Sequence, residues 1–331
     1  MISLHYLTPS EFALQTVAAD GRTLGVIAFG NQPEHSTVQD YPYAWANMPV
    51  LGGDTLFECW RCEQPVIREH LNGIHTARND DVLFGCLAID AYNDIAAVAH
   101  SAYIRIFDAI ESRGYRELLR VWHYFPRINE SENGLERYRH FNIGRYNAFV
   151  AKRRDLNTGA PAACAIGTRS GPLTIYFLAG RNPGQAIDNP RQASACNYPP
   201  QYGPRAPLFS RAMLVRQPGS RKAESPLLFI SGTASVIGHE TVHTGSAARQ
   251  AAETATNLAI VITEAQRAGF TPHQPAGLQL KVYVRNPHDQ PAVSAALAPA
   301  FGAAARIVYL HADICRADLL TEVEALCTAE C

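Results

Sequence analysis

The sequence predicts an α+β fold that contains a duplicated unit of strands and helices. Residues 278–285 alternate between apolar and polar side chains, as a strand with one buried face does. Residues 246–268 place Ala251, Leu258 and Ile262 on one face of a helix. Similar stretches recur in the same order in the first half of the chain, which favours a duplication over a chance match.

In the C-terminal half, the expected elements begin with an apolar strand at 227–231 that ends at Gly232. Thr244 or Ser246 caps the following helix, and Gly269 stops it. The remaining elements are a strand at 278–285, a helix at 289–301, a strand at 306–311, and a segment at 319–326 whose pattern fits either a helix or a strand.

The N-terminal half repeats this order. Leu119-Arg120-Val121-Trp122 is similar to residues 280–283, at the matching place in the order. The expected elements are a helix at 95–113, a strand at 117–124, a helix at 134–152, and strands at 162–167 and 173–179.

Six prolines lie between the two halves, in a stretch that also carries tyrosines and arginines. Prolines restrict the backbone of this stretch. Tyrosines and arginines held in this way are better suited to recognising an anion than to serving as a flexible linker. We therefore expect an N-terminal domain at 1–180, a Pro-rich connecting segment at 181–207 that contributes to the functional site, and a C-terminal domain at 208–331.

The composition narrows the function. The 331 residues include 29 Lys or Arg and 30 Asp or Glu, a net charge of −1, which argues against binding to nucleic acid. No apolar stretch approaches the ~18 residues of a membrane-spanning helix, and the first residues do not read as a secretion signal. We expect a cytoplasmic protein with reduced thiols that binds neither a membrane nor nucleic acid.

One motif points to a metal. His239-Glu240-Thr241-Val242-His243 matches the HExxH signature of zinc peptidases, and Glu264 is a candidate third ligand. Zinc binding by this motif requires a helix, yet Gly238 and Gly245 bracket it, and each glycine costs about 1 kcal/mol in a helix. We expect the motif to lie in a loop or turn and predict no metal site.

The C-terminal half resembles the YjgF/RidA family in the order of its elements and in the stretches SGTAS (231–235), LKVYVRN (280–286) and DLLTEVEA (318–325). This resemblance implies that the HExxH motif follows a strand rather than lying in a helix. It also implies that 319–326 forms a strand with Glu322 and Glu324 on one face.

The whole chain resembles the chorismatases, which carry two tandem YjgF/RidA-like domains. The match rests on residues 137–145, 189–212, 230–240 and 312–325. It implies that chorismate is cleaved to pyruvate plus 3-hydroxybenzoate, 4-hydroxybenzoate or both, which are precursors of pigments and ubiquinone. It further implies that no cofactor is needed and that the chain is a monomer or a small homo-oligomer.

The resemblance also assigns the site. Protonation of the vinyl carbon of chorismate needs a carboxylic acid with a raised pKa, and the matching residue is Glu322. Cys315 matches the position that directs the product toward a hydroxybenzoate. The two substrate carboxylates need arginines, with Arg137 and Arg139 as alternatives in the first half. The expected substrate-binding residues are Arg145, Tyr198, Tyr202, Arg205, Arg211 and Ala234.

Two other functions stay open from the sequence. One is a zinc metallopeptidase that uses His239, Glu240 and His243. The other is a non-catalytic YjgF-like module that binds a small carboxylate without turnover.

Overall fold

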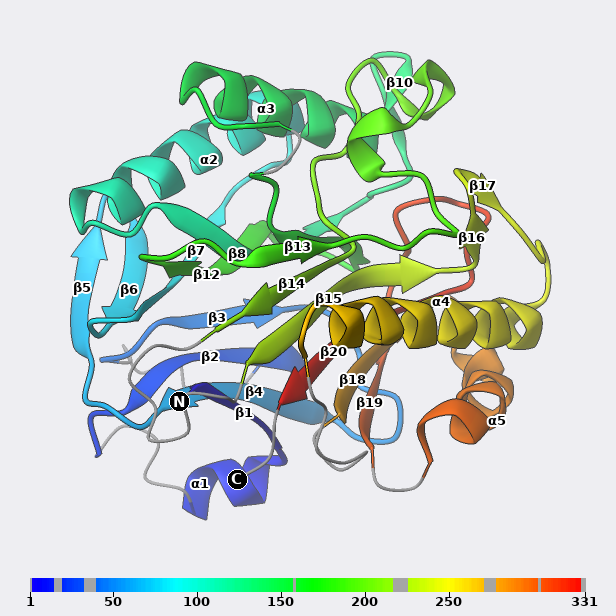
Figure 1. Cartoon of the computed structure of the whole chain (residues 1–331), viewed down its shortest axis with the longest axis horizontal. Helices are drawn as coiled ribbons and strands as arrows, with labels where there is room; N and C mark the ends of the chain where they lie inside the picture. Colours follow the sequence, from blue (N-terminus) through cyan, green and yellow to red (C-terminus); the bar gives the residue numbers. More distant parts are fainter. Residues whose placement is uncertain are drawn as a thin grey trace.

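The computed structural model describes residues 2–14, 20–32, 40–156, 159–216, 226–270, 278–302 and 305–328. Three larger β-sheets surround a shared apolar core, and helices lie on the outside of the molecule (Figure 1). No helix in these ranges is long and apolar enough to cross a membrane.

The first sheet comes from a part of the chain for which the sequence predicts no element. Its strand order is β1-β4-β2-β3. A short helix, α1 (Pro9–Leu14), lies beside it, and the ring of Phe12 stacks on Phe57 at a centroid distance of 4.1 Å. The strands are β1 (Ile2–Leu7), β2 (Thr23–Gly30), β3 (Tyr43–Ala46) and β4 (Thr55–Cys62).

The second sheet has the order β11-β8-β12-β7-β6-β5, and two helices cover its outer face. These helices are α2 (Ile95–Ser112) and α3 (Arg137–Ala151), which lie side by side in Figure 1. The strands are β5 (Ile67–Leu71), β6 (Ile74–Arg78), β7 (Val82–Ile89), β8 (Glu117–Pro126), β11 (Ala162–Thr168) and β12 (Leu173–Gly180), with a small hairpin of β9 (Ser131–Glu132) and β10 (Leu135–Glu136) before α3.

The third sheet has the order β13-β14-β15-β20-β18-β19. Helices α4 (Ala247–Arg267) and α5 (Gln290–Phe301) cover it, and Ser246 caps α4 as predicted, with its side chain accepting from the backbone nitrogen of Arg249. The strands are β13 (Gln185–Ile187), β14 (Ala212–Val215), β15 (Leu227–Ala234), β18 (Leu278–Val284), β19 (Arg306–His311) and β20 (Thr321–Thr328).

The duplication is confirmed by the topology. Both six-stranded sheets are built in the order strand, helix, strand, helix, strand, strand, which is the order expected of YjgF/RidA-like units. Each sheet also contains one parallel pair at the equivalent place, between the strands on either side of its second helix. These pairs are β8 with β11 and β18 with β19. The strands β8 and β18 carry one buried cation each, Arg120 and Lys281.

The prediction that a strand ends at Gly232 is wrong, because β15 continues through Gly232 to Ala234. The reason lies across the sheet. A Cβ atom on Gly232 would lie 1.9 Å from Oε1 of Glu322, so the glycine makes room for this side chain rather than ending the strand.

The HExxH motif does not form a helix, as expected. It falls on the small hairpin of β16 (Val236–Ile237) and β17 (Glu240–Thr241), with His239 in the turn. His243 has a φ of 60°, which interrupts any helix at this point. The segment expected as a helix or a strand at 319–326 is the strand β20.

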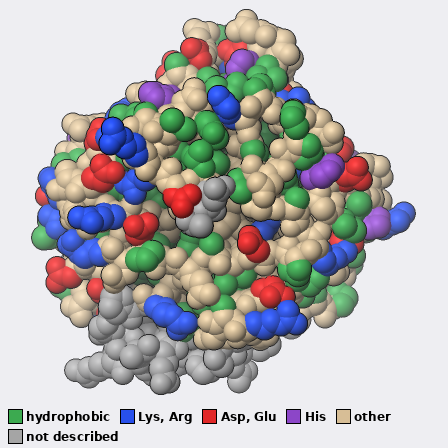
Figure 2. Space-filling model, turned by 45° about the horizontal axis from the view of Figure 1, so that its top comes forward, with side chains coloured by type: hydrophobic (Ala, Val, Ile, Leu, Met, Phe, Trp, Pro, Cys, Tyr) green, Lys and Arg blue, Asp and Glu red, His purple; other side chains and the backbone are tan. Residues whose placement is uncertain are grey.

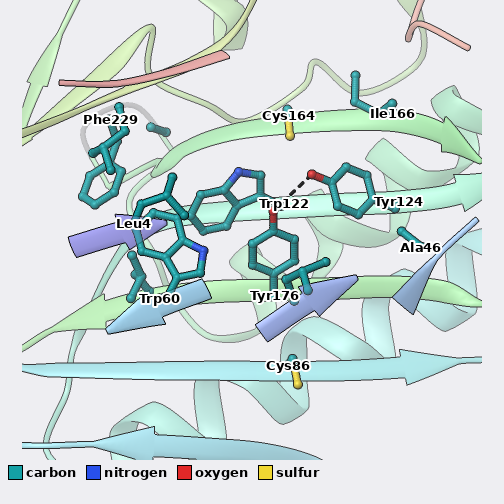
Figure 3. Packing of buried hydrophobic residues seen from close by; sticks show 14 of the residues in the cluster. Leu4, Ala46, Trp60, Cys86, Trp122, Tyr124, Cys164, Ile166, Tyr176 and Phe229 are labelled. Atoms are coloured by element: carbon teal, nitrogen blue, oxygen red, sulfur yellow. Dashed lines mark hydrogen bonds between the residues drawn. The ribbon is translucent and has the colours of Figure 1, made fainter. Parts of the chain in front are cut away.

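The core between the three sheets combines stacked aromatic rings with buried charges. Trp122 stacks on Tyr176 at 4.4 Å and packs against Trp60 at 5.3 Å, as the close view shows (Figure 3). The hydroxyl groups of Tyr176 and Tyr124 are hydrogen bonded at 3.1 Å. Four charged side chains are buried in the same region, namely Glu58, Arg120, Lys281 and Glu324.

Helix α3 is held against α2 by a close approach of the two backbones. A Cβ atom on Gly144 would lie 1.9 Å from the backbone oxygen of Ala96. Only a residue without a side chain fits this helix crossing. The crossing therefore fixes the position of Arg145, the next residue of α3.

We expect Gly144→Ala to destabilise the protein by about 1–3 kcal/mol, because the clash outweighs the gain in helix propensity. Urea denaturation measures this as a lower free energy of unfolding. Gly53→Ala is the matched control, since its new Cβ atom would meet the nearest atom, in Val50, at 3.7 Å. A Gly144→Ala protein as stable as the wild type would contradict this packing.

Candidate active site

A cavity of about 330 Å³ lies where the two duplicated units meet. The first unit supplies one wall from α3 and β11, and the second supplies the other from β15 and β20. Parts of the connecting segments at 192–211 and 315–319 complete the lining. A cavity that is formed by both units and is lined by arginines, tyrosines and a glutamate is suited to a small anionic ligand.

Glu322 lies in this cavity with its side chain withdrawn from water. It is 3% exposed, and its Cα partners in the neighbouring strands are Ala234 and Tyr283. The thiol of Cys315 donates to its Oε2 atom at 3.6 Å. Burial, reinforced by the negative charge of Glu324, raises the pKa of Glu322 to about 8. This carboxyl group therefore carries a proton at neutral pH.

The thiol of Cys315 is neutral as well. Burial, together with the adjacent Glu322, raises the pKa of this thiol well above its ordinary value. A neutral thiol is a hydrogen-bond donor and a poor nucleophile. The geometry therefore gives Cys315 a contact with the acid rather than an activated sulfur.

Arg145 presents an unsatisfied cation to the cavity. Its guanidinium group lies over the rings of Tyr103 and Phe149, at 5.1 and 5.6 Å. The side chain is buried, and its Nε and Nη2 atoms have no hydrogen-bond partner among the described residues. Asn142 lies three residues earlier on the same helix face, and its Nδ2 atom also has no hydrogen-bond partner among the described residues. Buried donors of this kind are typical of a site that awaits an anion.

A histidine that the sequence analysis missed supports Arg145 from behind. His123 lies on β8, with Nε2 2.6 Å from the Tyr103 hydroxyl and Nδ1 2.6 Å from the backbone oxygen of Cys164. Because a carbonyl oxygen only accepts, Nδ1 carries the hydrogen and Tyr103 donates to Nε2. Burial lowers the pKa of His123 well below its ordinary value, so the ring is neutral. It fixes Tyr103 and, through that ring, Arg145.

A second group of cations lies on the side of the connecting segments. Arg211 is buried, and its Nη2 atom donates to the hydroxyl of Tyr198 at 2.9 Å. Arg316 stacks on the ring of Tyr202 at 4.1 Å and donates to the backbone oxygen of His239 at 2.8 Å. The two tyrosines are thereby held between arginines.

The structure brings most of the predicted site residues together. Those that line the cavity are Glu322, Cys315, Arg145, Tyr198, Tyr202, Arg211 and Ala234. Arg205 does not line it: this side chain is exposed, and its guanidinium group stacks on Tyr146 at 4.7 Å. The proline-rich segment turns Arg205 toward the outside of α3, which the sequence did not reveal.

The alternatives to Arg145 lie elsewhere. Arg137 is buried away from the cavity, where it pairs with Glu132 and donates to the backbone oxygen of Ala91 at 2.6 Å. Arg139 lines the cavity but is 36% exposed and lies 3.3 Å from Glu136.

Several residues that line the cavity were missed by the sequence analysis, and only some of them could have been identified from the local sequence. Asn142 shares a helix face with Arg145 because it lies three positions earlier, and Arg316 directly follows Cys315. Nothing in the local sequence marks His123 or Gly232, whose roles depend on residues distant in the chain.

The residues of the HExxH motif do not converge. His239 faces Tyr202, with Nδ1 3.4 Å from the hydroxyl, whereas Nε2 of His243 lies 3.6 Å from Glu253. Glu264, the candidate third ligand, pairs with Arg267. Within the described ranges, no group of three His, Cys, Asp or Glu side chains is placed to hold a metal ion.

Comparisons with known proteins assign the family. The sequence model for the N-terminal domain of FkbO/Hyg5-like chorismatases matches residues 58–179. A 3-hydroxybenzoate synthase of Streptomyces hygroscopicus is 36% identical over 312 residues, which cover 92% of this chain and 91% of that protein. A chorismatase of Streptomyces rapamycinicus is 38% identical over 279 residues, 82% of each chain.

A comparison with solved structures supports the same family. The crystal structure of a chorismatase matches with a TM-score of 0.88 and 33% identity, covering 99% of this chain and 98% of that one. The chain therefore belongs to the chorismatase family. The expected α+β fold and enzyme class are confirmed, and neither the metallopeptidase nor the non-catalytic module gains support.

We expect the carboxyl group of Glu322 to titrate with a midpoint of about pH 8, because it is buried beside an anion. Infrared difference spectroscopy over a pH series measures this, and the band is assigned by its loss in Glu322→Gln. Glu240→Gln, which alters a glutamate on the exposed hairpin, is the control and should leave the band in place. A midpoint in the ordinary range of glutamates, near 4–5, would contradict the environment described.

Proposed function

We propose that this chorismatase cleaves the enolpyruvyl ether of chorismate, with Glu322 as the acid that protonates the vinyl methylene carbon. The observation that carries the proposal is a buried carboxyl group, in contact with a thiol rather than a cation, in a cavity whose buried arginines keep unpaired donors. The related 3-hydroxybenzoate synthase and chorismatases support the choice of substrate.

Carbon accepts a proton slowly, so the reaction needs an acid that is protonated at neutral pH and close to the substrate. Transfer of the Glu322 proton to the methylene carbon converts the enol ether into an oxocarbenium ion and leaves a carboxylate. Attack by water or by a ring hydroxyl then leads to release of pyruvate. A pKa of about 8 keeps the acid protonated before the transfer while leaving it acidic enough to donate.

Chorismate carries two carboxylates, and the cavity offers cations at two places. We assign one carboxylate to Arg145 with Asn142, because both keep unpaired donors. The other meets Tyr198 and Tyr202 of the connecting segment, together with Arg211 directly before β14. Charge-assisted hydrogen bonds from two sides would hold the substrate with its vinyl group toward Glu322.

Cys315 and Ala234 are placed to influence the product. Both line the cavity next to Glu322, one through its thiol and the other as its cross-strand partner. The resemblance to hydroxybenzoate-forming chorismatases supports an aromatic product, 3-hydroxybenzoate, 4-hydroxybenzoate or both. Hydroxybenzoate and pyruvate together contain the atoms of chorismate, so this route consumes no net water.

The remaining expectations about partners and location stay predictions. These are a cytoplasmic location, a monomer or small homo-oligomer, and no binding to membranes or nucleic acid. Acidic and basic side chains are mixed on the face drawn in Figure 2, in keeping with the net charge of −1.

We expect purified protein to release pyruvate from chorismate, measured with lactate dehydrogenase as the coupling enzyme. Glu322→Gln should lower kcat by about 10²- to 10⁴-fold while substrate binding persists, because the amide keeps the shape and loses the proton. In the wild type, kcat/KM should fall as the pH rises through about 8, where the acid becomes a carboxylate without a proton to give.

Glu240→Gln is the matched control, since it makes the same change at the HExxH motif. It should keep wild-type turnover, whereas a zinc enzyme would lose activity through this substitution and through a chelator. Failure of the wild type to release pyruvate, or full activity of Glu322→Gln, would refute the assignment.

The resemblance to chorismatases implies that members with an aliphatic residue at this position release a dihydrodiol, the product that forms when water attacks the oxocarbenium ion. For Cys315→Val we therefore expect the main product to change from hydroxybenzoate to this dihydrodiol, because the aliphatic side chain removes the thiol contact with Glu322. Chromatography of the product mixture measures the ratio. Cys315→Ser is the control, since its hydroxyl group still offers a donor to the acid. An unchanged product ratio in Cys315→Val would exclude this role for the thiol.

A further inference from the structure

The largest group of buried charges in the described ranges lies outside the cavity wall, next to Glu322. Glu58 on β4, Arg120 on β8, Lys281 on β18 and Glu324 on β20 are each at most 5% exposed. Lys281 pairs with both carboxylates, and Arg120 pairs with Glu324. This set is called the ion cluster below.

Within the ion cluster, Glu324 is surrounded by donors. Its Oε1 atom lies 2.7 Å from Nζ of Lys281 and accepts from Trp122 Nε1 at 3.0 Å and Tyr283 at 3.2 Å, while Oε2 accepts from Arg120. Burial alone would raise the pKa of Glu324, but Lys281 and Arg120 outweigh it and lower the pKa. Glu324 is therefore a fixed negative charge.

Glu322 lies two residues away on the same face of β20, about 6.6 Å along the strand. Its carboxyl group accepts from the thiol of Cys315, and no ion pair within the described residues involves it. One strand thus carries one carboxyl group that is saturated with cations and one that has none in contact. Such an asymmetry is how proteins assign different protonation states to two neighbouring acids.

The groups that face Glu322 come from several elements. Arg316, beside Cys315, and Arg120 on β8 favour the carboxylate, while burial and Glu324 favour the acid. Of the charges that act on Glu322, Glu324 is the one that opposes ionisation. The titratable groups on the elements packed against Glu322 include Tyr138 and Arg145 on α3, Cys164 on β11, and Tyr283 on β18. The remaining titratable side chains of the cavity lining are His123, Glu136, Arg139, Tyr198, Tyr202, Arg211 and Asp318.

We propose that Glu324, fixed as an anion by Arg120 and Lys281, is a positioning residue that keeps the proton on Glu322 until the substrate takes it. This inference rests on the proposed role of Glu322. The ion cluster then has a second task besides joining the sheets. It supplies a negative charge that cannot be neutralised by protonation, on the strand that carries the acid.

The test compares three variants by the infrared titration of Glu322 and by the pH profile of kcat/KM. Glu324→Gln should lower both midpoints by about one pH unit, because it removes the nearby anion and leaves one excess cation. At low pH its kcat should stay within about threefold of the wild type, because the acid itself remains. A residue with a merely structural role would lower activity at every pH and leave the midpoint unchanged.

Two further variants serve as controls, one for a failure of the single variant to fold and one for the change in the net charge of the ion cluster. Glu324→Gln with Arg120→Met removes one ion pair as a whole and leaves Lys281 paired with Glu58. The cluster stays neutral, which preserves the fold should the single variant fail. Its midpoint should also fall, by less. Glu58→Gln changes the net charge of the cluster equally, but on the far side of Lys281. It should shift the midpoint much less than Glu324→Gln does.

The proposal is overturned if neither variant at Glu324 moves the midpoint, or if Glu58→Gln moves it as far. The infrared midpoint does not depend on turnover. If Glu322→Gln stayed active, the catalytic role of Glu322 would fail while the effect of Glu324 on its protonation was still measured.

Discussion

Four buried charges at the junction of the three sheets are the constraint on which the rest of the structure depends. Burying an ion costs several kcal/mol unless it is paired, so Glu58, Arg120, Lys281 and Glu324 must meet for the sheets to pack. The four residues come from four strands of three sheets. Any slip of one sheet would leave a buried charge alone, and this fixes the relative positions of the two units that form the cavity.

The duplicated units have diverged into two roles. The first presents Arg145 on α3, and the second presents Glu322 on β20. The equivalent place in the first unit is Tyr176 on β12, which is paired with Trp122 as Glu322 is paired with Tyr283. Its hydroxyl group donates to Glu58 within the core. The first unit thus has a core tyrosine at this position, whereas the second has an acidic side chain that lines the cavity.

The sequence predicted the features that depend on local patterns, such as the strand at 306–311 and the cap of α4 at Ser246. Those that depend on distant residues were missed. Gly232 was taken as a strand end because its partner, Glu322, lies far along the chain. From alternation alone Glu322 resembles a solvent-facing strand residue, and only the family resemblance marked it. Arg205 was misplaced because composition does not show which way a proline-rich segment turns.

The central claim is that one strand holds a neutral and a charged glutamate two residues apart. Neutron diffraction from crystals of the free enzyme, exchanged into heavy water near pH 7, observes this directly. The account predicts a deuteron on the carboxyl group of Glu322 and none on Glu324. Two bare carboxylates, or a deuteron on Glu324 instead, would contradict it.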